Sequence, residues 1–515
     1  MTTAEELKLQ GNDRFKAGDY AVAIVQYSQA IDILQAENKK DSVIYANRSN
    51  AHFQLGDFLE ARNDAQLAIE NDPNYVKGYW RMAEICSCTL KHEEALENYR
   101  KAHDLMPKNK MIAEKLINVT NFIKATHEPK PKVSFFTALA GIPSRSFQPA
   151  QSNQQAQPQQ QYSNMNNQFA NPFGTTGTAP AVVDESGRDF HIPEKITEEF
   201  TTESQQIEFL SRLFNYCAQQ KVLHSEQLYK LMTQLGQLLD PIPAIYKAEV
   251  SDPKVVFVGD LHGSIQDFII LFTKKCSIEA LVQKKTTMVI LGDYVDRGPH
   301  GHQIFCFLSA LKLLCPTKVY LMRGNHETAQ MNNFFGYQAQ VETYYGTKSG
   351  VFPLLCNVFA ALPLMLFLHN TVKNEYYGCF HGGAPINSTN NSIEQFLNAN
   401  VQKCLEPSDQ ISQQLLWSDP QPMDDQVRMS HRGVGYCYGK TAYGQFASRI
   451  GLAKVFRGHE VVFERGGVRD DFGNQTHYTV FSSSNYMGQG NIGGIAQVDT
   501  VTGLVEIQPL LMTAK

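Results

Sequence analysis

The sequence predicts a multidomain protein, with an all-α array of helical repeats followed by a larger α/β domain. Three observations support this prediction. A repeat runs through residues 1–126, an uncharged Gln- and Asn-rich tract comes next, and from 191 to 515 apolar β-type runs alternate with helical patterns. Because 515 residues are too many for one ordinary core, two or three folded units are expected.

The N-terminal repeat has a period of 34 residues. Phe-Lys-Ala-Gly-Asp-Tyr at 15–20 is echoed by Phe-Gln-Leu-Gly-Asp-Phe at 53–58, with four extra residues in the polar stretch 36–41. Small residues recur at matching positions, namely Ala23, Ala30, Ala61, Ala68, Ala95 and Ala102. This period, with small residues where helices meet, is typical of tetratricopeptide repeats. We therefore expect three repeats, closed by a capping helix that carries Ile112, Leu116 and Ile123.

Residues 127–190 differ in composition from both flanks. Between Gln148 and Pro180 there is no charged residue, and Gln and Asn make up 14 of 33 positions. Such a tract buries too little apolar surface to offset its ordering entropy. It is predicted to be a disordered spacer, with a prion-like role as the alternative.

Charge and hydropathy argue against two classes of partner. A net charge of −5 gives no support for nucleic acid. The apolar run 351–368 is long enough to span a membrane, but Pro353, Asn357 and Pro363 predict a buried helix and then a buried strand. The N-terminus lacks a secretory pattern and the ten cysteines form no CxxC pair, which favours the cytoplasm, with the nucleus as a further compartment.

Five predicted strands end in polar, glycine-flanked motifs. These are Gly-Asp-Leu-His-Gly at 259–263, Gly-Asp-Tyr-Val-Asp-Arg-Gly at 292–298, Arg-Gly-Asn-His-Glu at 323–327, His-Gly-Gly at 381–383 and Arg-Gly-His-Glu at 457–460. Ligand-binding groups of α/β sheets gather at the carboxyl ends of strands, and glycine allows sharp turns and close approach there.

The motifs supply six candidate metal ligands: Asp260, His262, Asp293, Asn325, His381 and His459. Mixed oxygen and imidazole donors suit manganese, iron or zinc rather than calcium. Six ligands are too many for one site with an open position, but they fit two ions that share a carboxylate and a water. Such a pair, about 3.5–4 Å apart, promotes displacement at phosphorus.

With Leu-Leu-Trp-Ser-Asp-Pro at 415–420, His-Arg-Gly-Val at 431–434 and Asn485-Tyr486, the motifs resemble the phosphoprotein phosphatase family of metallophosphoesterases. The likeness covers almost the whole chain and extends to family members that carry N-terminal tetratricopeptide repeats. It implies a serine/threonine protein phosphatase acting on phosphoproteins, with a central β-sandwich flanked by helices at 191–515. It also implies two divalent ions, manganese or iron, with zinc or magnesium as alternatives.

The resemblance also implies a role for each site residue. Asp260, His262 and Asp293 would hold one metal, and Asp293, Asn325, His381 and His459 the other. His326 would be the general acid, oriented by Asp296, and the substrate phosphate would be bound by Arg297, Asn325, Arg432 and Tyr486. Trp417 and Asp419 are expected to be structural.

In the repeats, five residues match a peptide carboxylate clamp: Lys8, Asn12, Asn47, Lys77 and Arg81. By the same resemblance, the expected ligand is the acidic C-terminus of heat-shock protein 90 or heat-shock protein 70. The alternative is that these residues are ordinary solvated side chains on helix faces.

Two departures from the family pattern concern regulation. The family's Ser-Ala-Pro-Asn-Tyr-Cys is here Ser-Ser-Ser-Asn-Tyr-Met at 482–487, which predicts a more mobile loop and no anchor for cysteine-directed inhibitors. The chain stops soon after Ile507 without an amphipathic helix. That ending and the long linker speak against autoinhibition by the repeats.

Two other functions stay open at this point. A catalytically weak scaffold would recruit chaperones through its repeats, but it has no need of the complete ligand set or of His326 and Asp296. A metallophosphoesterase acting on nucleotides or phosphodiesters is disfavoured by the motifs around Trp417 and Arg432.

Overall fold

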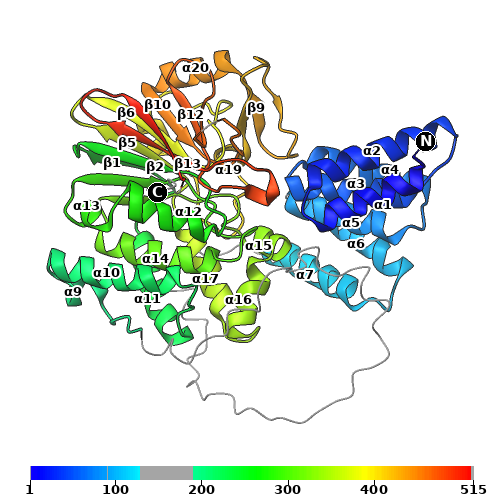
Figure 1. The fold of residues 1–515 in the computed structure, drawn as a ribbon, viewed down its shortest axis with the longest axis horizontal. Coiled ribbons are helices and arrows are strands. Elements are labelled where there is room, and N and C mark those ends of the chain that lie inside the picture. Colours follow the sequence, from blue (N-terminus) through cyan, green and yellow to red (C-terminus); the bar gives the residue numbers. More distant parts are fainter. Residues whose placement is uncertain (1, 90, 128–189, 465, 512–515) are drawn as a thin grey trace, which may run out of the picture.

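The computed structural model describes residues 2–89, 91–127, 190–464 and 466–511. The predicted linker therefore lies, apart from its two end residues, outside the described residues. In Figure 1 the helical array (blue to cyan) lies beside the larger α/β domain (green to red).

The array consists of three antiparallel helix pairs and a further helix. These are α1 (Ala4–Lys16), α2 (Tyr20–Ala36), α3 (Ser42–Leu55), α4 (Phe58–Asn71), α5 (Val76–Cys88), α6 (His92–Leu105) and α7 (Lys110–His127). All six alanines of the repeat pattern are completely buried. Side chains of this size allow the helix backbones to approach closely, so the predicted tetratricopeptide architecture is confirmed.

Local signals set the ends of these helices. Thr3 and Glu6 form a reciprocal capping box at the start of α1, and Asp41 accepts two backbone N–H groups at the start of α3. Gly56 ends α3 in the left-handed region, at φ +79°. This conformation turns the chain sharply into α4 and leaves the α3–α4 turn, residues 54–58, at one edge of the array.

Two mixed sheets form the centre of the α/β domain. Their strands are β1 (Ile245–Val250), β2 (Lys254–Val258), β3 (Thr286–Ile290), β4 (Val319–Leu321), β5 (Met365–Asn370), β6 (Glu375–Phe380), β10 (Leu452–Arg457), β11 (Val468–Asp470), β12 (His477–Val480), β13 (Gly494–Asp499) and β14 (Val505–Pro509). One sheet has the order β1-β5-β6-β10-β12-β11, and the other has the order β14-β13-β2-β3-β4.

The two sheets pack face to face. Phe257 of β2 and Phe456 of β10 stack with their ring centroids 3.6 Å apart and their planes at 6°, inside an apolar core drawn from both sheets. The predicted β-sandwich is therefore confirmed. The apolar run 351–368 forms helix α17 (Val351–Ala361) and strand β5, as expected. In the described part of the chain, no helix combines the length and apolarity needed to cross a membrane.

Helices cover both outer faces of the sandwich (Figure 1). The five-stranded sheet packs against α10 (Glu203–Ala218), α11 (Ser225–Leu239), α14 (Gly301–Leu314) and α17. The six-stranded sheet packs against α18 (Ile393–Leu397), α19 (Gln410–Trp417) and α20 (Lys440–Ile450). Smaller elements complete the domain, namely α9 (Ile196–Glu199), α12 (Ile265–Ile270), the π-helix Leu271–Lys275, α13 (Ile278–Val282), α15 (Ala329–Phe335), α16 (Tyr337–Tyr345), the 3₁₀ turn Tyr486–Gly488 and the small sheet of β7 (Asp419–Pro420), β9 (Tyr436–Tyr438) and β8 (Arg428–Met429).

Gly259 offers a test of the sandwich. It follows β2, and a Cβ atom placed on it would lie 1.8 Å from the carbonyl oxygen of Val480. Since backbone rather than a flexible side chain must move, we expect Gly259→Ala to lower the free energy of unfolding by about 1–3 kcal/mol or more. Urea unfolding of the full chain, followed by circular dichroism, measures the change.

The matched control is Gly444→Ala in α20, where the added Cβ atom meets nothing within 4 Å. Alanine is the better helix former, so this variant should be unchanged or more stable by about 0.5–1 kcal/mol. Equal unfolding midpoints for the two variants would contradict the packing argument.

Candidate active site

The six predicted ligands meet at one edge of the sandwich. Strands β2, β3, β4, β6 and β10 end there and deliver, in turn, Asp260 and His262, then Asp293, Asn325, His381 and His459. All six side chains are buried, and His459 is the most exposed at 8%.

Asp293 lies at the centre of this cluster. Its Oδ2 atom is 3.4 Å from Nε2 of His262 and 3.4 Å from Nε2 of His381. Two buried groups of potential donors therefore share this carboxylate: one adds His262 and His326, and the other adds His381 and His459. Such sharing is what a binuclear centre requires.

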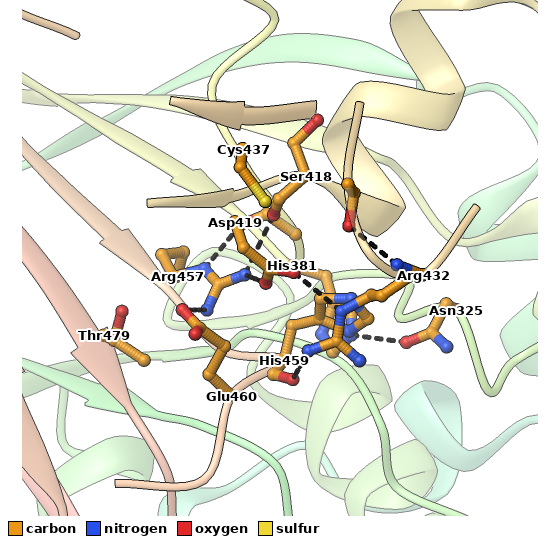
Figure 2. A network of polar contacts seen from close by, with 12 residues as sticks. Asn325, His381, Ser418, Asp419, Arg432, Cys437, Arg457, His459, Glu460 and Thr479 are labelled. Carbon is orange, nitrogen blue, oxygen red and sulfur yellow. Dashed lines mark hydrogen bonds and ion pairs between the residues drawn. The ribbon is translucent and has the colours of Figure 1, made fainter. Parts of the chain in front are cut away.

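Asp260 and Asn325 lie at the margins of the same cluster. The Oδ2 atom of Asp260 is 3.9 Å from Nε2 of His262, and both its oxygens accept the backbone N–H of His459, at 2.9 and 3.1 Å. The Oδ1 atom of Asn325 lies 2.8 Å from Nε2 of His381 (Figure 2). Both side chains thus present oxygen atoms beside the imidazoles.

The histidines are oriented as metal ligands are. Nδ1 of His262 lies 3.0 Å from the carbonyl oxygen of Val295, and Nδ1 of His381 lies 3.0 Å from that of Leu291. Donation of Nδ1–H to these carbonyls leaves each Nε2 lone pair facing the cluster. The Nδ1 atom of His459 lies 3.1 Å from Nε2 of His381 and so faces the same cluster, while its buried Nε2 has no hydrogen-bond partner among the described residues. Burial lowers the pKa of all three imidazoles, which keeps them neutral.

The two carboxylates of the cluster, Asp260 and Asp293, are also affected by burial, but their pKa values shift upward. Burial raises the pKa of Asp260 to about 7, and burial also raises the pKa of Asp293. Two ionised carboxylates buried in one cluster destabilise the fold unless cations compensate their charge. Neutral imidazoles and anionic oxygens converging on one buried point therefore fit divalent metal ions.

Glycines and one further acid shape the backbone around this cluster. A Cβ atom on Gly324 would lie 2.1 Å from Oδ1 of Asp293, and one on Gly458 would lie 2.3 Å from Oδ1 of Asp260. Glu327, to which the sequence assigned no role, accepts the backbone N–H groups of Asp293, Tyr294 and Gly324 at 2.8–2.9 Å. Its place in the Arg-Gly-Asn-His-Glu motif was the available signal.

His326 and Asp296 form a pair next to the cluster. Nδ1 of His326 is 2.8 Å from Oδ2 of Asp296, and its ring centroid is 4.8 Å from that of His262. Burial lowers the pKa of His326 and raises that of Asp296 to about 6. The arrangement fixes the Nδ1 side of the imidazole and leaves Nε2 for exchange of a proton.

Arg432 is held by a buried network of ion pairs (Figure 2). Its Nε atom donates to Oδ2 of Asp419 at 2.7 Å, while Arg457 donates to Oδ1 of the same carboxylate at 2.8 Å. Asp419, expected to be structural, therefore also orients a predicted phosphate-binding residue. Trp417, likewise expected to be structural, lines the same cavity as the predicted metal ligands.

The repeat array covers the site. Leu55, Gly56 and Phe58 of the α3–α4 turn line a cavity of about 170 Å³ together with most of the predicted metal ligands. Nη1 of Arg297 donates to the carbonyl oxygen of Gln54 at 2.5 Å, and its guanidinium lies 3.8 Å from the ring centroid of Phe335. The sequence leaves open whether the repeats cover the site, and in this structure the α3–α4 turn lies over it despite the long linker.

Aromatic residues pack the α3–α4 turn against the α/β domain. Phe53 stacks on Phe335 with centroids 5.7 Å apart and planes at 19°, and Phe58 meets Trp417 edge-on at 6.2 Å. The two phenylalanines are almost completely buried and belong to one apolar cluster with the outer face of the six-stranded sheet. Sequence reasoning missed this contact because it took the segment 53–58 only as an echo of the repeat.

Hydrogen bonds of Ser484 tie the loop 482–487 to helix α12. Ser484 stands where the family has proline, and its N–H and hydroxyl donate to the two carboxylate oxygens of Asp267, both at 2.7 Å. Proline has no N–H, so the substitution adds a bond that we had not expected. Tyr486 stacks on His262 with centroids 5.1 Å apart, and Met487 packs against the first repeat helices.

The five clamp residues lie on the first helices of the three pairs, α1, α3 and α5. Asn12 accepts a hydrogen bond from Asn47 at 2.9 Å. Lys8 forms ion pairs with Glu5 at 2.5 Å and Asp41 at 3.3 Å, and Arg81 pairs with Glu84 at 2.5 Å. Burial and the nearby charge of Arg81 lower the pKa of Lys77. The basic side chains are thus partly compensated within the array.

Comparisons with known proteins agree with this geometry. The calcineurin-like phosphoesterase family matches residues 253–463. Human serine/threonine-protein phosphatase 5 is 29% identical over 492 residues, which cover 95% of this chain and 86% of the human protein. The serine/threonine-protein phosphatase 4 catalytic subunit of Eremothecium gossypii is 32% identical over 56% of this chain and 87% of its own length.

A solved protein serine/threonine phosphatase from Saccharomyces cerevisiae, described as similar to human phosphatase PP5, has 30% sequence identity and a TM-score of 0.50. The match covers 57% of this chain and 88% of that one. Shared site motifs, shared fold and this degree of identity place the chain among the phosphoprotein phosphatases of the calcineurin-like group. The chain belongs to this family and is a serine/threonine protein phosphatase that resembles protein phosphatase 5 and carries N-terminal tetratricopeptide repeats.

Proposed function

We propose that this phosphatase hydrolyses phosphoserine and phosphothreonine in proteins at a binuclear metal centre. The observation that carries the proposal is the carboxylate of Asp293, which lies between Nε2 of His262 and Nε2 of His381. Asp260 and His262 with Asp293 would hold one ion, and Asn325, His381 and His459 with Asp293 the other. Two ions here, manganese or iron with zinc or magnesium as alternatives, would acidify a water and polarise the phosphoryl oxygens.

The remaining residues bind phosphate and move the proton. Arg297 and Arg432 present planar guanidinium groups that suit phosphoryl oxygens, and Asn325 and Tyr486 line the same cavity. His326 gives its proton to the departing serine or threonine oxygen, because an alkoxide is a poor leaving group. Its bond to Asp296 supports this role over that of a third ligand in the group of His262 and Asp293.

Replacement of His326 tests the proton-transfer role. We expect His326→Asn to lower kcat on a phosphoserine peptide by about 10²–10⁴-fold, because the leaving oxygen then departs unprotonated. Metal content, measured by mass spectrometry of the purified protein, should stay at the wild-type value. His369→Asn is the matched control, since His369 contacts Asn374, Glu249 and Tyr376 rather than the predicted ligands. Loss of metal from His326→Asn would instead make His326 a ligand.

We also propose that the repeat array holds the enzyme in a closed, weakly active state. The α3–α4 turn lines the cavity that holds the predicted metal ligands. The carbonyl of Gln54 accepts a hydrogen bond from Arg297, one of the predicted phosphate-binding residues. A phosphoprotein segment cannot reach the cluster until the turn leaves. Small phosphate esters need less space and should be hindered less.

Phe53 provides the test of closure. Phe53→Ala removes the stack on Phe335, so we expect a several-fold rise in kcat/KM on a phosphoserine peptide and a smaller rise on p-nitrophenyl phosphate. Circular dichroism checks that the repeats remain folded. Leu67→Ala, an exposed position on α4, is the control and should leave both values unchanged. Unchanged peptide activity in folded Phe53→Ala would contradict the closed state.

The repeats, we propose further, dock the enzyme on the acidic C-terminus of heat-shock protein 90 or heat-shock protein 70. Support comes from two basic residues one turn apart on α5, Lys77 and Arg81, and from the bonded amides of Asn12 and Asn47. A terminal carboxylate would compete with Glu84 for Arg81 and with Asp41 for Lys8. This partner and the reduced cysteines suit the cytoplasm, with the nucleus as a further compartment.

Lys77→Ala and Arg81→Ala should each weaken binding of an acidic C-terminal peptide by about 1.5–3 kcal/mol, the range for hydrogen bonds to charged groups. Isothermal titration calorimetry of the full chain measures the loss. Lys101→Ala on α6, an exposed lysine outside the predicted clamp, controls for net charge. If all three variants lose the same affinity, binding is nonspecific attraction and the clamp is disproved.

A further inference from the structure

Asn332 of α15 lies behind the proton-transfer pair. Its side chain is completely buried, and its Nδ2 atom donates to Oδ2 of Asp296 at 2.9 Å and to the backbone carbonyl of His326 at 2.8 Å. Both partners can only accept in these contacts. The nitrogen end of the amide must therefore face them, and the orientation of the side chain is fixed by chemistry.

The bonds of Asp296 show what this contact does. Its Oδ2 atom faces Nδ1 of His326 at 2.8 Å as well as Asn332, and its Oδ1 atom accepts the backbone N–H of Tyr337 at 2.9 Å. Asn332 is thus the side chain that ties the carboxylate of Asp296 to the backbone of His326. Through it, the carboxylate and the imidazole keep one relative position.

Asn332 fits this task better than it fits a purely structural one. Its Oδ1 atom is buried and has no hydrogen-bond partner within the part of the chain that the structure describes. A buried acceptor left without a partner lowers stability, because its desolvation is not compensated. For stability alone, an apolar side chain of similar size would avoid that cost, so the benefit of the amide lies with its two N–H bonds.

We propose that Asn332 is a positioning residue for protonation of the leaving group, an inference that rests on the general-acid role proposed for His326. As the bond from phosphorus to the serine or threonine oxygen breaks, its electron pair stays on that oxygen, which takes the proton from Nε2 of His326. Water supplies the new oxygen on phosphorus. Asn332 touches neither substrate nor metal ligand side chains; it acts by keeping Asp296 and His326 aligned during the transfer.

The experiment compares leaving groups. Full-length Asn332→Leu and Asn332→Ser are assayed on a series of small phosphate esters, from p-nitrophenyl phosphate to alkyl phosphates. Because p-nitrophenolate departs without protonation, its kcat should fall by less than about threefold, while kcat on the alkyl ester should fall by about 10–10²-fold. KM and metal content should stay near the wild-type values.

A double variant tests the role of Asn332 separately from the general-acid role proposed for His326. If Asn332 acts through His326, His326→Asn/Asn332→Leu should be no slower on the alkyl ester than His326→Asn alone. If His326→Asn itself shows no greater loss on alkyl than on aryl esters, the general-acid role fails. If it does, but both Asn332 variants lose activity equally on all esters, only the role of Asn332 is overturned.

Asn370→Leu is the matched control. Asn370 is another completely buried asparagine whose Nδ2 atom donates twice, to Tyr377 and Thr500, far along the chain from the site. Its loss should lower the melting temperature and affect all esters in parallel. The same parallel pattern in the Asn332 variants would show that Asn332 is structural.

Discussion

The buried carboxylate of Asp293 is the constraint on which the rest of the site depends. It can stay ionised in so dry a place only if positive charge compensates it. Divalent ions would supply that charge, and five strand ends bring neutral imidazoles, two carboxylates and the amide oxygen of Asn325 around one point as their donors. The backbone must bend sharply to do so, and Asp293 and His459 both lie in the left-handed region, at φ +53° and +72°. Strain of this kind persists only where the surrounding structure enforces it.

How far the sequence predicts this protein depends on whether a feature is local. The repeat period shows directly because each alanine packs against a neighbour one helix away, and the strand-end motifs show because each strand delivers its own ligand. Asn332, Asp419 and Glu327 form hydrogen bonds with residues on other elements. Their spacing in the sequence does not indicate which residues these partners are. The packing of the α3–α4 turn against the α/β domain is the feature hardest to predict. Nothing in the local sequence distinguishes a turn that packs on another domain from one that faces water.

The closed arrangement uses the same apolar chemistry as a domain core. Phe53 and Phe58 continue the apolar cluster on the outer face of the six-stranded sheet, so separating the two parts exposes aromatic surface on both sides. Burial of a phenylalanine contributes about 1.5–3 kcal/mol, so a few such contacts can balance the ordering of two domains. A contact of this strength is reversible, which a regulated enzyme needs.

One polar contact at the same interface, between Arg297 and Gln54, is easily exchanged for a bond to substrate. Arg297 donates to a neutral backbone carbonyl of Gln54, whereas a substrate phosphate offers it charged oxygens and the stronger bond. In the competition for this guanidinium, phosphate therefore wins once it has access, and the aromatic packing of Phe53 and Phe58 decides whether it gains that access. The array is thus held mainly by apolar burial, with further hydrogen bonds such as that from the N–H of Leu59 to the carbonyl of His431, and it gives up the bond between Arg297 and Gln54 at little cost. In the closed state that we propose, control of this enzyme lies in the fit of one turn of the repeats rather than in the chemistry of the proposed metal centre.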